Sequence, residues 1–539
     1  MSLRIVCICT VALVVIAAPT ASARKETAES PAFATSDRCI ACHSTLHTSS
    51  GEDVSIGYDW RATMMANSAR DPYWHAGVRR EVTDHPSAQA AIEDKCSTCH
   101  MPMARFDAVT RGLRGEVLAN LSAAAPAHRL AFDGVSCTVC HQIKADNLGK
   151  HESFDGGFEI DRGTALGSRP IYGPHAVDAG RESVMRSATQ FSQAESAHVR
   201  ESELCATCHT LYTTALDERG EVIGELPEQV PYQEWRHSEF RETRSCQSCH
   251  MPPVAAEMPI SSILGTQRPP LAQHTFRGGN AFMLGILNKY RGELGVAALP
   301  QELDTAIRET KDYLGSSAAR VVIDSAKVTG TTLALAVRVE NLGGHKLPTA
   351  YPARRVWLHV RVTDDAGAVL FESGAPKADG SIAGNDNDED ALKFEPHYRE
   401  IARPDEVQIY ESIMADRDGR VTTGLLRGVR YAKDNRLLPR GFDKATADAE
   451  VAVHGDAERD ADFVGGSDRL SYRVDLGRAR AAALRVDITL LYQSIGYRWV
   501  ENLRAYDAPE PQRFVRYYQD SATGSALTLA EARTTVPAR

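Results

Sequence analysis

The sequence has no cysteine after residue 249, although it runs to 539 residues. Twelve cysteines are present, and ten of them fall into five short clusters before that point. The other two, Cys7 and Cys9, lie in an apolar N-terminal run. Disulfide bonds are therefore excluded from the second half of the chain, and the clusters leave no cysteine over for a disulfide framework in the first half.

Positive charge is also scarce. Lysine and arginine number 61 against 71 aspartates and glutamates, so the formal net charge at pH 7 is -10. This acidic balance argues against nucleic acid as a partner. Beyond the N-terminal run, we find no stretch of sequence that is long and apolar enough to cross a membrane.

Each cysteine cluster has the form Cys-x-x-Cys-His, with different residues between the cysteines. The five copies are Cys39-Cys42-His43, Cys96-Cys99-His100, Cys137-Cys140-His141, Cys205-Cys208-His209 and Cys246-Cys249-His250. This spacing is the attachment signature of c-type haem: the two thiols bond covalently to the porphyrin, and the histidine binds the iron from one side. We therefore predict five covalently bound haems.

Two other interpretations of a Cys-x-x-Cys pair were weighed. A single pair is also found in redox disulfides and as half of a zinc site. Either would require the histidine in the fifth place to be a coincidence, and here it recurs five times. A zinc site would also call for cysteine pairs without histidine, which the sequence lacks, or for His-x-x-x-His pairs, of which the one present, His43 and His47, begins with a motif histidine.

The second axial ligand decides what a haem iron does, because two side-chain ligands suit electron transfer whereas an open position admits substrate. Nine further histidines precede residue 275: His47, His75, His85, His128, His151, His175, His198, His237 and His274. Four of them, His85, His128, His198 and His237, lie seven to eleven residues before the next motif, and His274 follows the last one. We predict these five as the second ligands.

Other side chains compete for the same role. His75, in DPYWHAG, is the nearest challenger. Met64 and Met65 are further candidates, since methionine ligation raises a haem's potential, but packing on a helix face is the favoured interpretation. His345, in NLGGHKLPTAYPARR, either caps a haem from the second half of the chain or fixes a turn, and we favour the turn.

The segment GNDNDED carries Asp386, Asp388 and Asp390 at alternate positions. Calcium prefers such oxygen ligands. However, position twelve of an EF-type loop would fall on His397, and the glycine of that loop is missing. A solvated acidic loop is therefore the favoured interpretation.

The N-terminus has the features of a secretory signal peptide over residues 1–23. A basic start is followed by an apolar run and a small-x-small site at Ala21-Ser22-Ala23. An uncleaved membrane anchor is the alternative. Because c-type haem is attached outside the bacterial cytoplasm, the leader and the motifs support each other, and we expect a periplasmic or extracellular protein.

The composition divides the chain into segments. We predict a pentahaem domain over 31–290, a helical linker over 291–317, an antiparallel β-sandwich over 318–505 and a C-terminal tail over 506–539. The fold class is thus α + β and multidomain: a mostly helical or loop-rich haem domain with little strand, followed by a β-sandwich.

Periodicity supports these segments. The stretch DWRATMMANSA predicts a helix that ends at Asp71-Pro72, and two more helices are expected over 280–291 and 300–315. From residue 320 the apolar residues alternate, as in TTLALAVRVEN and ALRVDITLLYQ, which indicates antiparallel strands with one buried face. The tail from Ser521 is expected to be loosely ordered.

Several phrases resemble a known family. Five of them resemble bacterial multihaem c-type cytochromes related to the tetrahaem cytochrome that accepts electrons from hydroxylamine oxidation. These are DGVSCTVCH, SELCATCHTLYT, PYQEWRHSEF, CQSCHMPP and HTFRGGN. NLGGHKLPTAYPARRVWLHVRVTDDAG resembles the β-domain that often follows such modules. The resemblance implies haems in close parallel and perpendicular pairs, mostly with two histidine ligands. Since this chain has five motifs where that cytochrome has four, the partner is not carried over.

Three functions follow as hypotheses. The first is an electron carrier with redox partner proteins, other cytochromes or a quinol-linked donor, and no catalytic residues. The second is a haem oxidoreductase that acts on a small nitrogen or sulfur compound at one haem with an open axial position. Pentahaem nitrite reductases carry a Cys-x-x-Cys-Lys motif at that haem, and none occurs here. The third is a binding or attachment module centred on the β-domain. The carrier is favoured.

Overall fold

The computed structural model describes residues 31–477 and 482–537. The predicted signal peptide and its alternative, an uncleaved anchor, lie outside the described residues. In the first part of the chain, short helices are separated by long loops. These helices are α1 (Asp37–Ile40), α2 (Ile56–Arg61), α3 (Pro72–Asp84), α4 (Gln89–His100), α5 (Pro102–Thr110), α6 (His128–Phe132), α7 (Cys137–Cys140), α8 (Ala179–Thr189), α9 (Ser202–Ala206), α10 (Pro231–Arg236), α11 (Cys246–His250), α12 (Ala281–Lys289), α13 (Arg291–Leu294) and α14 (Pro300–Ser317).

Helix α3 shows where the predicted helix boundaries were wrong. Asp71 and Pro72 open this helix instead of ending the one before it: the Asp71 carboxylate accepts from the backbone N–H groups of Tyr73 and Trp74 at 2.8 and 3.2 Å. Aspartate at the N-cap and proline at the first helical position are start signals. Likewise, α14 continues through Gly315 to Ser317.

Two short strand pairs interrupt the helices of this region, where little strand was expected. Strand β1 (Pro170–Gly173) pairs with β2 (Ser192–Glu195) in parallel, and β3 (Leu211–Leu216) forms an antiparallel hairpin with β4 (Val222–Gln229). The segment between β3 and β4 reads DERGE, a turn signal of the kind that was recognised only in the second half of the chain.

The second part of the chain is built on two sheets, which bear out the strands that alternation predicted. The larger sheet has the order β11-β10-β7-β14-β15, with β12 on β10 and β8 on β7, and the smaller one has the order β5-β6-β13-β9. Their strands are β5 (Ala319–Thr329), β6 (Thr332–Asn341), β7 (Arg355–Asp364), β8 (Val369–Ser373), β9 (Glu400–Ile401), β10 (Ile409–Ala415), β11 (Val421–Thr422), β12 (Arg430–Asp434), β13 (Ser467–Asp475), β14 (Ala483–Gln493) and β15 (Ala526–Pro537).

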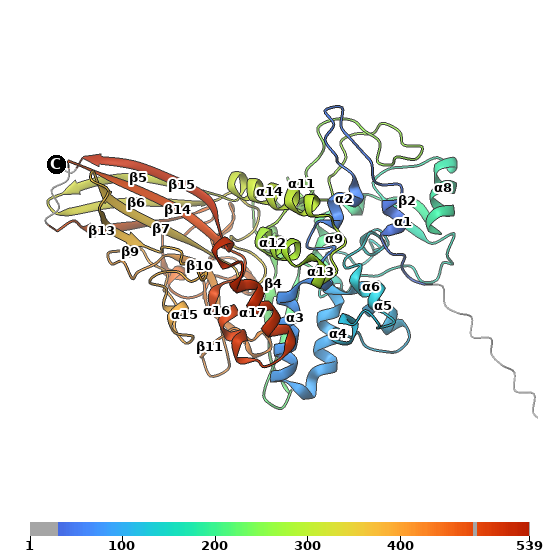
Figure 1. Cartoon of the computed structure of the whole chain (residues 1–539), viewed down its shortest axis with the longest axis horizontal. Helices are drawn as coiled ribbons and strands as arrows, with labels where there is room; N and C mark the ends of the chain where they lie inside the picture. Colours follow the sequence, from blue (N-terminus) through green and yellow to red (C-terminus); the bar gives the residue numbers. More distant parts are fainter. Residues whose placement is uncertain (1–30, 478–481, 538–539) are drawn as a thin grey trace, which may run out of the picture. The chain divides into compact units, whose positions relative to one another are not determined.

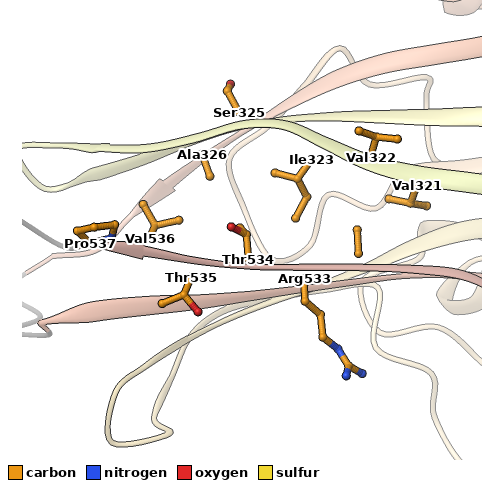
Figure 2. A pocket seen from close by; sticks show the side chains of 11 residues that line it. Val321, Val322, Ile323, Ser325, Ala326, Arg533, Thr534, Thr535, Val536 and Pro537 are labelled. Atoms are coloured by element: carbon orange, nitrogen blue, oxygen red, sulfur yellow. The ribbon is translucent and has the colours of Figure 1, made fainter.

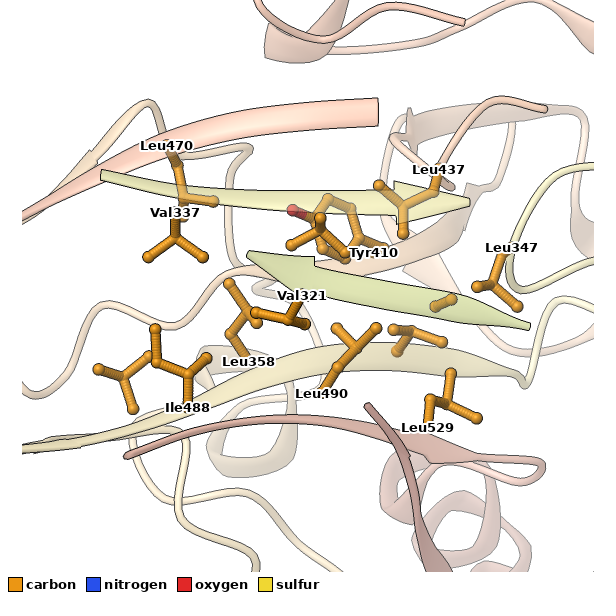
Figure 3. Close-up of a cluster of buried hydrophobic side chains, with 14 of the residues drawn as sticks. Val321, Val337, Leu347, Leu358, Tyr410, Leu437, Leu470, Ile488, Leu490 and Leu529 are labelled. Carbon is orange, nitrogen blue, oxygen red and sulfur yellow. The ribbon is translucent and has the colours of Figure 1, made fainter. Parts of the chain in front are cut away.

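One hydrophobic cluster joins the two sheets (Figure 3). From β6 it takes Leu333, Leu335, Val337 and Val339, which are at most 2% exposed, and from the larger sheet it takes every second residue of β7 and β14. The period of two places these apolar side chains on one face of each strand, and burying them is what holds strands of this length together.

The C-terminal segment differs from the loosely ordered tail that the sequence suggested. Strand β15 pairs with β14 along its whole length and puts Leu529 into the shared cluster. Its apolar residues Leu527 and Leu529 alternate with exposed or partly exposed ones, so the period-two signal was present but short. Three helices complete this part: α15 (Asp386–Glu389), α16 (Tyr497–Glu501) and α17 (Pro509–Gln519).

Helix α17 also links the end of the chain to its beginning. It lies beside α3 in Figure 1, where Phe514 packs on Tyr73 with ring centres 5.0 Å apart and Glu510 pairs with Arg79 at 2.8 Å. Such contacts gather residues 32–539 into one compact unit. None of the helices within 31–477 and 482–537 has the length and apolar composition of a membrane span.

The position of β15 generates the first prediction. Leu529 is 1% exposed, so Leu529→Ala should lower the free energy of unfolding by about 2–5 kcal/mol, the usual cost of a cavity of this size. The neighbouring Thr528 points outward, and Thr528→Ala should change it by less than about 0.5 kcal/mol. Chemical denaturation of both variants measures the difference. Equal, small effects would contradict the packing of β15.

Candidate haem-binding site

The five Cys-x-x-Cys-His motifs lie on short helical turns. Motif one overlaps α1, motif two ends α4, motif three overlaps α7, motif four overlaps α9 and motif five forms α11. One helical turn brings residues three apart onto the same side, which is what two thiols need to reach one planar ring system. All ten cysteines of the motifs are free and partly exposed, as thiols intended for a covalent partner other than cysteine should be.

Thiols of different motifs meet in space. Cys39 of motif one lies near Cys137 of motif three, Cys99 of motif two near Cys208 of motif four, and Cys205 of motif four near Cys246 of motif five, each pair close enough for one thiol to shift the pKa of the other. These pairs are separate from the pairs within each motif. The motifs therefore lie next to one another as one and three, two and four, and four and five.

Backbone contacts fix the same neighbours. The N–H of Cys246 donates to Ser202 at 3.1 Å, which ties motif five to the helix of motif four. The N–H of Gly156 donates to the carbonyl of Thr207 at 2.6 Å, and the same glycine lies against Thr98. Motif four thus sits between motifs two and five.

Motif four also lies near motif three. The contact with Cys246 and burial raise the pKa of the Cys205 thiol, and Cys140 of motif three adds to this effect. The contact of Cys208 with Cys99, together with burial, raises its pKa, again with a contribution from Cys140. The five motifs consequently form one connected set. Motif one neighbours motif three, and motif three neighbours motif four. Motifs two and five are both neighbours of motif four.

In the part of the chain that the structure describes, four of the motif histidines form a hydrogen bond through one ring nitrogen only. The Nδ1 atom of His43 lies 2.6 Å from the carbonyl of Ile260, that of His100 lies 3.2 Å from Ser68, and that of His141 lies 2.6 Å from Tyr172. His250 makes the same contact to the carbonyl of Arg277. Because a carbonyl only accepts, Nδ1 carries the proton and Nε2 keeps its lone pair.

This arrangement fits an iron ligand. Metal-bound histidines characteristically donate their second ring N–H to a carbonyl or carboxylate, which fixes tautomer and orientation. Burial also lowers the pKa of His100 and His250 to about 4, so both rings are neutral at physiological pH. Desolvation also lowers the pKa of His209, and its ring has no hydrogen bond to the described residues. The donor set therefore fits the haem iron that the motifs predict.

Among the predicted second ligands, His274 is the one that the structure places opposite a motif histidine. Its ring centre lies 6.3 Å from that of His141, and the ring planes differ by 23°. Two imidazoles bound to opposite sides of one metal, with bonds of about 2 Å, have ring centres about 6 Å apart. The Nδ1 atom of His274 faces the carbonyl of Ala272 at 3.1 Å, so Nε2 is again the free nitrogen.

His85 and His128 keep a nitrogen free as well. His85 is 3% exposed, and neither of its ring nitrogens has a hydrogen-bond partner within residues 31–477 and 482–537. Buried polar groups are nearly always paired, so an orphaned imidazole calls for a ligand. In His128, Nδ1 faces the carbonyl of Asn120 at 2.9 Å and Nε2 has no partner among the described residues. Both therefore fit the predicted role of second iron ligand. Among the described residues, however, neither ring lies opposite the ring of a motif histidine.

His198 and His237 are placed differently. His198 uses both ring nitrogens, Nδ1 toward Ser196 at 2.6 Å and Nε2 toward the carbonyl of Ile143 at 2.8 Å. In His237, Nε2 pairs with the Asp448 carboxylate at 3.0 Å. As placed, neither offers Nε2 to a metal, so we leave both out of the ligand set proposed below. Spacing along the chain could not reveal partners that lie 55 and 211 residues away.

Of the competing candidates, His75 and Met64 have other contacts, whereas His345 lies near a motif histidine. His75 is fully engaged, with Nε2 toward the carbonyl of Ala69 at 2.8 Å and Nδ1 toward Arg513 at 3.0 Å. Met64 packs on a hydrophobic cluster, the role that was favoured for it. His345 lies in the turn after β6, with its ring near His250.

The acidic segment around α15 is not solvated throughout. Asp388 is 8% exposed and forms a bidentate pair with Arg355 at 2.8 and 3.0 Å. It also accepts from the N–H of Ile382. Its oxygens are therefore committed to the protein, and the calcium alternative gains no support from this geometry.

A buried cluster of His397, Asp460 and Asp468 went unnoticed in the sequence. Nε2 of His397 lies 3.3 Å from Asp460 and 3.8 Å from Asp468, a spacing that would suit metal ligands. However, the amide groups of Gln408 and Asn435 both donate to Nδ1, at 3.0 and 3.1 Å.

Those two amides cannot turn over, because their oxygens accept from the backbone N–H groups of Tyr398 and Glu411. The proton of the neutral His397 ring must therefore sit on Nε2, between the carboxylates. The cluster belongs to a polar network in which Tyr410 donates to Asp468 at 2.7 Å, while Nε2 of His397 has no hydrogen-bond partner among the described residues. No sequence signal joins residues more than 60 positions apart in this way.

A hollow of about 450 Å³ lies between β5 and β15 (Figure 2). Its lining is mainly aliphatic and hydroxyl side chains, with Arg533 as its charged member. None of the motif cysteines or histidines contributes to it. It therefore has no part in the chemistry of the motifs.

The ring contacts generate the second prediction. In the haem-loaded protein, His274→Ala should convert one low-spin iron to high-spin in the electron paramagnetic resonance spectrum, because it removes one of two facing imidazoles. His198→Ala and His237→Ala serve as controls and should leave every iron signal unchanged. A change in a control variant together with an unchanged His274→Ala spectrum would reverse the assignment.

Comparison with known proteins bears on the fold. No family model matches the chain, and no curated protein matches its sequence. A search of solved structures finds the crystal structure of a penta-heme cytochrome c552 from Thermochromatium tepidum, with a TM-score of 0.53 and 16% sequence identity over 93% of this chain and 99% of that one. At this identity the likeness concerns fold alone. The chain thus has a fold similar to that of a multihaem cytochrome c.

Proposed function

We propose that this protein is a multihaem c-type cytochrome that carries electrons between redox partners through five covalently bound haems. The observation that carries the proposal is the set of five Cys-x-x-Cys-His motifs, four of whose histidines are fixed through Nδ1 with Nε2 free. A disulfide site would not require this second feature, and a zinc site would not repeat Cys-x-x-Cys-His five times. The similar fold of a penta-heme cytochrome supports the same conclusion.

The residues that would hold the haems follow from the motifs. Ten cysteines attach them, in the pairs Cys39/Cys42, Cys96/Cys99, Cys137/Cys140, Cys205/Cys208 and Cys246/Cys249. The iron ligands from the motifs are His43, His100, His141, His209 and His250. His274 is the second ligand opposite His141, and His85 and His128 remain candidates for other irons. When bound, haem iron supplies one-electron redox chemistry.

The chain itself sets how close the motifs lie to one another and what surrounds the histidine rings. Hydrogen bonds such as those from Cys246 N–H to Ser202 and from Gly156 N–H to Thr207 keep neighbouring motifs side by side, as one-electron transfer between centres requires. Carbonyl groups orient the imidazoles, and burial keeps them neutral and uncharged at physiological pH. A protein tunes the reduction potential of a haem through the identity of the ligands, the hydrogen bonds to them and burial.

The finer features belong to the same proposal. The two sheets that share a hydrophobic cluster would form a β-sandwich over residues 318–505, which β15 extends, and the haem domain would span 31–290. A cleaved leader over 1–23 would place the protein in the periplasm or outside the cell. With a net charge of -10, its partners would be neutral or basic redox proteins, either cytochromes or a quinol-linked donor. A relationship to the hydroxylamine-linked cytochromes also remains part of the proposal.

Carbon monoxide tests the proposed function. It binds reduced haem iron only where an axial position is open, so a carrier with two protein ligands on each iron should show no spectral change when the gas is added to the reduced protein. A cytochrome c with two protein ligands on its iron and a globin with an open axial position calibrate the measurement. A full change at one haem would favour the oxidoreductase alternative over the carrier.

A further inference from the structure

We propose that His345 is the second axial ligand of the haem held by motif five, so that the sheet-forming half of the chain completes a site in the motif-bearing half. This inference rests on the proposed function, because it presumes a haem on Cys246 and Cys249. It departs from the sequence, in which His345 was expected to fix a turn.

The first support is the distance between two rings. The ring centre of His345 lies 6.1 Å from that of His250, with the planes 14° apart. This nearly repeats the 6.3 Å and 23° of His141 and His274. It also matches the separation of about 6 Å for two imidazoles on opposite sides of one metal. Rings in direct contact lie closer, as Trp74 and His100 do at 4.3 Å.

The second support is the hydrogen bonding of both rings. The Nδ1 atom of His345 faces the carbonyl of Lys346 at 2.9 Å, and Nδ1 of His250 faces the carbonyl of Arg277. Each ring thus carries its proton on Nδ1. Neither Nε2 atom has a hydrogen-bond partner in the described part of the chain. Both histidines therefore present the tautomer that a metal requires.

The third support is the way the turn is anchored. The N–H of Lys346, next to His345, donates to the Glu234 carboxylate at 3.0 Å, and Thr349 donates to the same group. Glu234 lies in α10, twelve residues before Cys246, and its side chain is 0% exposed. The turn is thus tied to the segment that leads into motif five.

Charge compensation keeps that anchor in place. Arg436 joins Glu234 at 2.8 Å to Asp434 at 2.7 Å, and the Lys346 ammonium reaches Asp434 at 2.8 Å. All four side chains are at most 7% exposed, so two positive and two negative groups balance inside the protein. Breaking such a buried network is strongly unfavourable. This network explains why the turn holds one position against motif five.

The turn itself is fixed from its other side. Asn341, the last residue of β6, donates from its side-chain amide to the carbonyl of His345 at 2.8 Å and accepts from the N–H of Gly343 at 2.8 Å. Gly344 lies directly against Trp235 and Phe240, which follow Glu234. His345 therefore has little freedom to point elsewhere.

Replacement of His345 in the full-length haem-loaded protein tests the assignment. With His345→Ala, one iron should change from low-spin to high-spin, bind carbon monoxide after reduction, and return to low-spin when imidazole is added. The iron affected should differ from the one that responds to His274→Ala. With His345→Met, the same iron should stay six-coordinate and its reduction potential should rise.

His359→Ala is the matched control. His359 is also in the sheet-forming half, but its Nε2 pairs with Glu372 at 2.9 Å, so all iron signals should be unchanged. If the His345 variants carry five haems and all their spectra match the unmodified protein, the assignment is wrong while the proposed function stands. If the unmodified protein carries no haem, the proposed function itself fails.

Discussion

The constraint on which the site depends is a hydrogen bond from a histidine Nδ1 to a backbone carbonyl. It recurs at His43, His100, His141 and His250, each time with a carbonyl from a different segment of the chain. One such bond decides which nitrogen is protonated, where the ring points, and that Nε2 remains available. The loops of the first half of the chain, which have little regular structure, are thus positioned to orient these rings.

A second constraint joins the two halves of the molecule. Glu234, Lys346, Asp434 and Arg436 form a buried network with balanced charge, and the pair of Arg79 and Glu510 adds a further link. Burial opposes ionisation of Asp434, but Arg436 and Lys346 outweigh it and hold the pKa of that carboxyl well below its usual range. Since removing one member would strand a buried charge, the network fixes how the sheets meet the motif-bearing helices.

The sequence predicted those features that depend on neighbours along the chain. Motif spacing is local chemistry, and the alternation of Leu333, Leu335, Val337 and Val339 correctly identified a strand with one buried face. Asp71 and Pro72 were misread because the same two residues serve as a stop signal or a start signal, depending on which side the helix lies. The helix of α3 shows that they start one.

Features that depend on contacts between residues far apart in the sequence were harder to predict from the sequence. His198 and His237 precede their motifs at a spacing similar to that of His85 and His128, yet Ile143 and Asp448 occupy their Nε2 atoms. His345 lies about a hundred residues from His250, and only the fold brings their rings together. The buried network of His397 with two aspartates is another case that no local pattern could indicate.

The account stands on one haem being attached covalently at each motif. Intact-mass spectrometry of the mature, exported protein tests this most directly, because thioether-bound haem survives denaturation and adds its mass to the chain. The account predicts the mass of the polypeptide plus five haem groups, and Cys205→Ala together with Cys208→Ala should remove one of them. A mature protein with the mass of the polypeptide alone would contradict the account.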